Sequence, residues 1–215
     1  MTLPAGWVPS DTGEVAERFG VSRETAEALE CFAALLSRWT RTVNLISAGS
    51  IPDLWSRHIL DSAQLFGAVQ SPPRHWVDLG SGGGLPAIVC ALLACDAGWT
   101  TQFTLLESDQ RKCAFLTTAL RDLSLSARVL PNRLEAAAPQ NADLLTARAL
   151  APLDVLLDWS LRHANEQATY LFPKGARFQE EISDAERRWT FTLDTLPSIT
   201  DPAARLLRLR DLAKR

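Results

Sequence analysis

Residues 77–86 read VDLGSGGGLP, so an acidic side chain, Asp78, lies two residues before the first of four closely spaced glycines. Glycine has no Cβ, and a glycine-rich turn therefore lets a ligand approach the backbone and meet free N–H groups. Turns of this kind between a strand and a helix bind two classes of cofactor, the dinucleotides and S-adenosylmethionine. The stretch predicts a cofactor site, and the charge of Asp78 bears on which class it accepts.

The spacing Gly82-x-Gly84-x-x-Ala87 matches the looser form of the dinucleotide pattern, which is a weak signal alone. A dinucleotide would bring a doubly negative pyrophosphate close to Asp78, and the repulsion would cost on the order of 1 kcal/mol or more. S-adenosylmethionine carries an ammonium and a sulfonium and has no phosphate. The sign of the charge at Asp78 therefore favours S-adenosylmethionine.

A second acid, Glu107, ends the next strand-like run along the chain. An acid at that place can accept hydrogen bonds from both ribose hydroxyls of either cofactor. Two structural alternatives remain open. Glu107 could be a solvated acid before a helix that begins at Asp109, and Asp78 could simply form the turn.

The segment after the fourth strand-like run reads TARALAPL, residues 146–153, and lacks the D/N-P-P-Y/F motif of amino-group methyltransferases. The chain also lacks the Pro-Cys pair of cysteine-assisted attack, and its histidines and cysteines do not fall at metal-ligand spacing. Instead, Arg148 stands where a catalytic acid would be expected. A nucleophile with its own lone pair, such as a purine N7, needs alignment and no general base.

Three roles for Arg148 stay open. It could contact a guanine O6 and N7 edge or a phosphate. It could line the cofactor pocket, or it could form a structural salt bridge with Asp78 or Glu107.

The elements that must position these residues alternate along the chain. Strand-like runs fall at 75–79, 101–106, 127–130, 143–147 and 169–172, with helix-like stretches at 85–95, 109–123, 153–163 and 176–189. Such alternation predicts a parallel sheet with helices on both faces, and ligands bind beyond the carboxyl ends of its strands. The predicted site therefore comprises residues 78–84, 107–109, 132–135, 148–152 and 174–175.

The two ends of the chain follow other patterns. An apolar stripe at helical spacing predicts a helix within 21–43, and Ser50-Ile-Pro-Asp predicts a second helix start. Two period-two runs near the C-terminus, at 189–193 and 205–209, predict an antiparallel hairpin joined through Asp201-Pro202. We expect a helical extension over residues 1–70 on a core of residues 71–215, together one structural domain.

Composition restricts the class of protein. The 215 residues are 47% hydrophobic and 22% charged, which is ordinary for a globular protein. The acidic N-terminal stretch does not resemble a signal peptide, no run is long enough to span a bilayer, and no CxxC pair is present, so we expect a cytoplasmic protein with buried, reduced cysteines. The net charge is −3, yet six of the acidic residues lie within 1–30, so charge does not exclude a nucleic-acid partner.

Over residues 36–175 the chain resembles the bacterial 16S ribosomal RNA guanine-N7 methyltransferases, also called glucose-inhibited division protein B. The resemblance rests on Asn44-Leu45, RHILDS at 57–62, VDLGSGGGLP, Leu106-Glu107-Ser108, NRLE at 132–135, Ala147-Arg148-Ala149 and FPKG at 172–175. It implies a Rossmann-like class I S-adenosylmethionine-dependent methyltransferase sheet, mostly parallel, with an antiparallel C-terminal hairpin and an N-terminal helical cap. One departure is visible: the family commonly has Gly where this chain has Ala87, which still permits close packing.

The resemblance also implies site residues. With the acids discussed above, the expected cofactor site is Asp78, Gly80, Ser81, Gly82, Leu85, Glu107, Ser108, Leu134, Glu135 and Arg148. The residues expected to face RNA are Arg133, Arg148 and Lys174, and Arg148 is a positioning residue in a site without a general base. His58 is expected to anchor the helical cap with Asp61.

The implied activity is transfer of a methyl group from S-adenosylmethionine to N7 of a guanine in the decoding-centre loop of 16S rRNA. The implied partner is 16S rRNA or the small ribosomal subunit, and we expect a monomer without metal or membrane association. Two alternatives are a methyltransferase of another substrate, either a small molecule or a protein, and a non-catalytic ribosome-assembly factor.

Overall fold

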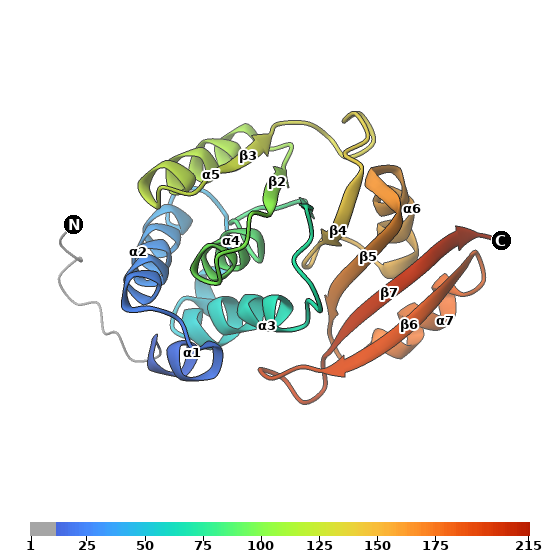
Figure 1. The fold of residues 1–215 in the computed structure, drawn as a ribbon, viewed down its shortest axis with the longest axis horizontal. Helices are drawn as coiled ribbons and strands as arrows, with labels where there is room; N and C mark the ends of the chain where they lie inside the picture. The colour runs from blue at the N-terminus through green and yellow to red at the C-terminus, as the bar shows by residue number, and fades with distance from the viewer. Residues whose placement is uncertain (1–11) are drawn as a thin grey trace.

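The computed structural model describes residues 12–215, and these form one seven-stranded sheet with helices on both faces (Figure 1). The strands are β1 (His75–Leu79), β2 (Gln102–Leu106), β3 (Ala127–Leu130), β4 (Ala142–Thr146), β5 (Ala164–Lys174), β6 (Trp189–Pro197) and β7 (Arg205–Lys214). They lie in the order β3-β2-β1-β4-β5-β7-β6, in which the pairings among β1 to β5 are parallel and β7 runs antiparallel to β5 and β6. The predicted fold class is confirmed.

The strand order reverses between β1 and β4. The chain builds outward from β1 through β2 to β3, and then returns to place β4 on the other side of β1. Their pairing brings Asp78 opposite Thr146. A crevice opens beyond the carboxyl ends of the strands at such a reversal, which makes this the expected ligand site.

Alternation along the strands divides the core into two layers. Trp76 of β1 packs with α2 (Arg23–Thr40), α3 (Asp61–Gly67), α4 (Ala87–Asp96) and α5 (Gln110–Asp122). Val77 and Leu79 face the other way, toward α6 (Leu153–His163) and α7 (Phe178–Ala185). Because successive side chains of a strand point to opposite faces, one strand contributes to both layers.

The N-terminal helices pack on the rest of the protein through apolar contacts and through hydrogen bonds at the N-terminus of α2. Helix α1 (Thr12–Phe19) precedes α2, whose N-cap Ser22 accepts from the N–H of Thr25. Asp96, at the end of α4, accepts from the Ser22 backbone N–H and from the Thr25 hydroxyl. A short 3₁₀ turn, η1 (Ala48–Ser50), and a π-helical turn, η2 (Trp55–Leu60), then lead into α3.

The observed elements differ from the sequence prediction mainly at their ends. Strand β5 begins at Ala164, earlier than the predicted residue 169, because Ala164 already pairs with Ala142 of β4 although residues 165–167 are polar. Helix α7 ends at Ala185, since Trp189 is already the first residue of β6. The helix predicted to start near Ser50 and run through Leu54 and Trp55 is present but starts later, because residues 48–50 form η1 and the helix then opens with the π turn η2. Within residues 12–215, no helix combines the length and apolarity that a membrane span requires.

Candidate functional site

A cavity of about 360 Å³ opens beyond the carboxyl ends of β1 to β4. That volume lies within the range of small-molecule sites in proteins. Its lining consists of Leu45, Gly80, Ser81, Gly82, Gly83, Leu85, Leu106, Glu107, Ser108, Lys112, Asn132, Arg133, Leu134, Glu135, Arg148, Ala149, Leu150 and Trp159. The cavity therefore sits where the strand order predicts a ligand.

Three glycines of the loop after β1 have positive φ angles, of +65° at Gly80, +51° at Gly82 and +76° at Gly84. A Cβ on Gly80 would lie 2.5 Å from Cδ1 of Leu150, and one on Gly84 would lie 2.5 Å from Cδ1 of Ile88. A Cβ on Gly82 would meet only the Gly80 carbonyl oxygen, at 3.8 Å. Gly80 and Gly84 thus permit internal packing, whereas Gly82 keeps the cavity open.

Glu107 lines the cavity and is 8% exposed. Its Oε2 accepts from the N–H of Gly82 at 2.9 Å, and its Oε1 accepts from the N–H of Asp109 at 2.8 Å. The carboxylate thereby ties the glycine loop to the start of α5. Each oxygen has a second lone pair, so both can still accept from hydroxyl groups of a ligand.

Asp78 does not line the cavity; its side chain is buried beneath the loop, with 1% exposure. Oδ1 accepts from the Thr146 hydroxyl at 2.7 Å, and that hydroxyl accepts from the indole N–H of Trp76 at 3.0 Å. Oδ2 has no hydrogen-bond partner among the described residues. Burial raises the pKa of Asp78 to about 6, against the lowering effect of the Thr146 bond. This is a desolvated acid with one buried oxygen that has no hydrogen-bond donor.

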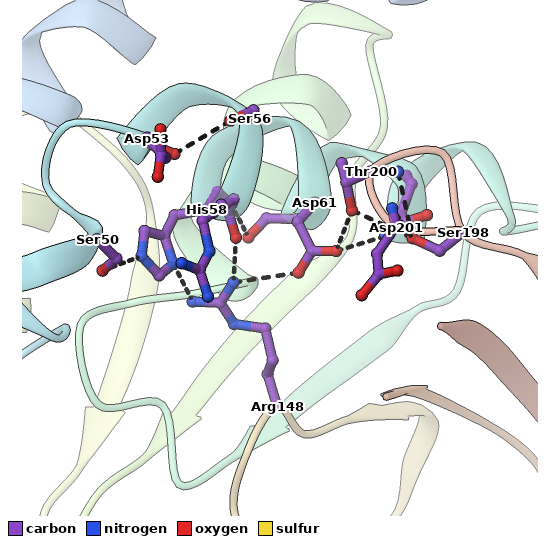
Figure 2. A network of polar contacts seen from close by, with 12 residues as sticks. Ser50, Asp53, Ser56, His58, Asp61, Arg148, Ser198, Thr200 and Asp201 are labelled. Atoms are coloured by element: carbon purple, nitrogen blue, oxygen red, sulfur yellow. Dashed lines mark hydrogen bonds and ion pairs between the residues drawn. The ribbon is translucent and has the colours of Figure 1, made fainter. Parts of the chain in front are cut away.

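Arg148 lines the cavity, and its guanidinium turns toward the helical cap (Figure 2). Nη1 donates to Oδ2 of Asp61 and to the carbonyl of Arg57, both at 3.2 Å, and Nη2 donates to Nδ1 of His58 at 3.0 Å. The salt bridge is therefore with Asp61, and the alternative of a bridge to Asp78 or Glu107 is wrong.

His58 is held as a neutral acceptor. Arginine only donates, so Nδ1 of His58 must carry a lone pair, and Nε2–H then donates to the Ser50 hydroxyl at 2.8 Å. Burial, together with the charges of Arg148 and Arg57, lowers the pKa of His58 to about 4. His58 anchors the cap through Arg148, while its predicted partner Asp61 contacts the same guanidinium (Figure 2).

The residues predicted to face RNA lie in different environments. Arg133 is exposed at the mouth of the cavity, and no ion pair involves it within residues 12–215. Lys174 is 9% exposed; its Nζ donates to Oε2 of Glu181 at 2.7 Å and to the carbonyl of Ala151 at 2.9 Å. Its ammonium supports the loop after β4 from inside the protein, and this position gives no support to an RNA contact.

Most of the predicted cofactor residues come together at the cavity; Asp78 alone among them lies behind its wall. Sequence reasoning missed Trp159, which projects from the second turn of α6 and follows no strand directly. It also missed Leu45 and Lys112, which lie outside the predicted ranges, whereas Leu150, which packs on Gly80, lies within the predicted range 148–152. Ala149 between Arg148 and Leu150 has φ +51°, a left-handed conformation that alanine rarely adopts.

Metal-ligating side chains do not gather in this structure. Within the described residues, no group of three His, Cys, Asp or Glu could hold a metal ion. All four cysteines are free thiols. Cys90 and Cys113 are buried, but Cys95 is exposed, so the expectation that all the cysteines are buried is wrong.

Comparison with known proteins gives close matches in sequence. A family model described as rRNA small subunit methyltransferase G matches residues 25–205. The chain is 47% identical over 194 residues to the ribosomal RNA small subunit methyltransferase G of Ruegeria sp. (strain TM1040), covering 90% of this chain and 94% of that protein. It is 48% identical over 199 residues to the protein of the same name from a strain of Cereibacter sphaeroides, covering 93% of this chain and 97% of that protein.

Similar solved structures share the fold at low sequence identity. A SAM-dependent methyltransferase from Aquifex aeolicus aligns with a TM-score of 0.54 and 11% identity, over 75% of this chain and 93% of that one. M. jannaschii TYW2 in complex with AdoMet aligns with a TM-score of 0.54 and 11% identity, over 75% of this chain and 78% of that one.

Proposed function

The chain belongs to the rRNA small subunit methyltransferase G family, and on this premise we propose that it methylates N7 of a guanine in the decoding-centre loop of 16S rRNA. The family gives the coarser activity: the chain is an rRNA methyltransferase that uses S-adenosylmethionine as methyl donor. The nucleotide and the atom are the finer part of the proposal, and they are supported by the chemistry of the cavity.

The residues at the cavity fit S-adenosylmethionine. The donor, when bound, supplies an electrophilic methyl group on a sulfonium. Glu107 would accept from the ribose hydroxyls, and Gly80, Ser81 and Gly82 would let the donor approach the backbone closely. The N–H groups of Ser81 and Gly82 already donate to the Leu106 carbonyl and to Glu107. The unpaired Oδ2 of Asp78 complements an ammonium, because a buried carboxylate oxygen without a donor favours a nearby cation. Leu85, Ser108, Leu134 and Glu135 would enclose the rest of the cofactor, with the last two near the adenine.

The observation that carries the choice of N7 is that both basic side chains in contact with Arg148, His58 and Asp61, already accept from its guanidinium. The exposed Glu135 also lines the cavity and is assigned to the adenine side. The carboxylate of Glu107 accepts from two backbone N–H groups and is assigned to the ribose hydroxyls, and the imidazole of His58 already accepts from Arg148. An amino or hydroxyl acceptor would have to lose a proton to such a base, whereas guanine N7 attacks with its own lone pair. Positioning of the base is then the main contribution of the protein.

Arg148 would position the acceptor by donating to guanine O6 or to a phosphate. It cannot donate to N7 during the reaction, since the lone pair of that atom forms the new bond. Three of its five N–H groups are used by the cap, and two remain for a ligand. We therefore assign Arg148 a positioning role and no part in proton transfer.

Cations without carboxylate partners support an RNA contact around the cavity. Lys112 and Arg133 line it, and Arg57 lies exposed on the turn that contacts Arg148. None of the three forms an ion pair with another described residue, whereas Arg74 at the opposite edge pairs with Asp143. Phosphates are the usual partners of such cations on RNA-binding surfaces. We keep Arg133 and Arg148 as candidate RNA contacts and reassign Lys174 to supporting the loop.

We further propose that the chain acts as a monomer in the cytoplasm, with residues 1–70 as a helical extension on a core of residues 71–215. Residues 1–11 of that extension lie outside the described residues. Packing supports the arrangement, since α2 and α3 share one apolar core with α4 and Trp76.

Transfer of tritiated methyl groups to small subunits, naked 16S RNA and bulk protein, assayed in parallel, tests the function. We expect label in the 16S rRNA of small subunits, at a guanosine that borohydride and aniline then cleave, as N7-methylation requires. Label confined to protein would overturn the RNA assignment, and labelled RNA resistant to that cleavage would overturn N7. Binding without any transfer would favour the assembly-factor alternative.

A further inference from the structure

One carboxylate, that of Asp61, joins three segments that are far apart in the sequence (Figure 2). Its Oδ2 accepts from Nη1 of Arg148 at 3.2 Å. Its Oδ1 accepts from Nε2 of Gln64 at 2.7 Å and from the Thr200 hydroxyl at 2.9 Å. Asp61 begins α3, Arg148 follows β4, and Thr200 lies in the turn between β6 and β7.

Hydrogen bonds within the turn between β6 and β7 hold the Thr200 hydroxyl toward Asp61. The Ser198 hydroxyl accepts from the backbone N–H groups of Thr200 and Asp201, at 3.3 and 3.4 Å, and lies 3.1 Å from the Thr200 hydroxyl. Thr200 gives its single proton to Asp61, so Ser198 must be the donor between the two hydroxyls. The N–H of Ile199 also donates to Oε1 of Gln64 at 3.0 Å, which holds the turn against α3.

The Asp61–Arg148 pair is shielded from water. The side chains of Arg148 and Asp61 are 16% and 19% exposed, whereas those of the surface pair Arg23–Glu27 are 87% and 59% exposed. Charge-assisted hydrogen bonds gain strength as water is excluded, and surface pairs contribute little. The orientation of Asp61 therefore has a direct effect on where the guanidinium lies.

A second carboxylate, that of Asp78, lies near the same cation without a hydrogen bond to it. Arg148 is close enough to Asp78 to lower its pKa, yet Oδ2 of Asp78 has no hydrogen-bond partner among the described residues. The guanidinium is held by Asp61, His58 and the Arg57 carbonyl, which lie on the cap side. Asp61 thus holds Arg148 on the cap side, and the Asp78 carboxylate receives no hydrogen bond from the guanidinium.

We propose that Asp61 is a positioning residue for Arg148, that Thr200 fixes the orientation of Asp61, and that together they keep Asp78 available to the ammonium of the methyl donor. This inference rests on the proposed function for the identity of the cofactor. The Asp61 side chain is not part of the cavity lining, whereas its partner Arg148 is, so the contact with Arg148 is the route by which we expect Asp61 to affect cofactor binding.

Calorimetric titration with S-adenosylhomocysteine, which carries the same ammonium, tests the inference without an RNA substrate. We expect D61N to weaken binding about tenfold and T200V about threefold, consistent with loss of a charged and a neutral hydrogen bond. T200S keeps the hydroxyl and should bind as the wild type does. T192V is the matched control. Thr192 belongs to the same hairpin and its hydroxyl also donates to an aspartate, Asp211, at 2.8 Å, but it lies farther along β6, away from this network.

A double-mutant cycle with R148Q separates positioning from general structural damage. If Asp61 acts through Arg148, D61N and T200V should have no further effect on affinity in the R148Q background. Undiminished effects in that background, or equal affinities of T200V and T192V, would overturn the inference. Failure of the wild type to bind S-adenosylhomocysteine would instead refute the assigned cofactor, and failure to label RNA would refute the substrate.

Discussion

The carboxylate of Glu107 accepts from the backbone N–H of Gly82 at 2.9 Å, and this bond joins the end of β2 to the loop that follows β1. The two strands are parallel neighbours, so their carboxyl ends meet at one edge of the sheet. Gly82 can lie there with φ +51° because it has no side chain. The acid thus shapes the loop before any ligand arrives and still has lone pairs for one.

Substitution of Glu107 should weaken cofactor binding. In Glu107→Ala, the hydroxyls of a bound ribose and the N–H of Gly82 would lose their acceptor, and we expect a loss of about 1–3 kcal/mol in binding free energy. Calorimetric titration with S-adenosylhomocysteine measures the change. Glu166→Gln, at an exposed position on β5, serves as the control and should leave affinity unchanged. Equal affinities of the two variants would remove Glu107 from the site.

At neutral pH, the ionised Asp78 should lower the free energy of unfolding of the protein without bound ligand. Burial raises the pKa of Asp78 from 3.8 to about 6, so the folded state binds a proton more tightly than the unfolded state does. The destabilisation is absent below pH 3.8, grows as the pH rises to about 6, and is then constant at up to roughly 3 kcal/mol. Asp78→Asn should therefore raise the free energy of unfolding more at pH 7.5 than at pH 5, as measured by urea unfolding.

The same substitution should impair binding, and this separates function from stability. S-adenosylhomocysteine should bind the wild type more tightly as the pH rises from 5 to 7, because its ammonium favours the ionised carboxylate. In Asp78→Asn the affinity should be lower and nearly independent of pH over that interval. A variant that is more stable and binds with unchanged affinity would show that Oδ2 of Asp78 does not meet the cofactor.

The sequence predicts the location of the site better than the partners within it. Most of the lining residues lie within a few positions after the end of a strand: residues 80–85, Glu107, Leu134 and Arg148. Strand ends can be recognised in a sequence from hydrophobic alternation and turn residues. The sheet order then places those ends together, so the cavity follows from topology.

Side-chain pairing depends on packing that the pattern does not contain. Asp61 and Arg148 are separated by 87 positions, and they meet because the start of α3 packs beside the loop that follows β4. The sequence predicts that Lys174 follows a strand, but it is instead the last residue of β5, where Glu181 of α7 lies close enough to accept from its ammonium. Each of these pairs forms because two elements far apart in the sequence pack side by side, and the local sequence does not determine that packing.

Alanine substitutions of the loop glycines Gly80 and Gly82 should have different effects, one on stability and the other on cofactor binding. Gly80→Ala would add a Cβ 2.5 Å from Leu150 to the strain of a positive φ, whereas the Cβ of Gly82→Ala would meet no close neighbour. Gly98→Ala is the matched control, with φ +71° and open space around the Cβ, and should cost about 1 kcal/mol through φ alone. Thermal unfolding should rank Gly80→Ala as the least stable of the three. Gly82→Ala should match the control in stability and yet lose affinity for S-adenosylhomocysteine; retained affinity would show that the ligand does not approach this position.

Neutralising Arg133 should weaken the engagement of ribosomal RNA in a salt-dependent way. Its side chain is exposed at the mouth of the cavity and pairs with no described carboxylate, so a phosphate contact would release one condensed counterion. For Arg133→Gln we expect a lower kcat/KM on small subunits at low salt, and a slope of log kcat/KM against log salt concentration that is shallower by about 0.7–0.9. Arg128→Gln is the matched control, because Arg128 is also without an ion pair in the described part of the chain but lies among residues near the amino ends of β2 and β3. Measurement of kcat/KM at about 50 to 300 mM salt gives the slope for each variant. Equal slopes for Arg133→Gln and Arg128→Gln would indicate that the RNA binds to another surface.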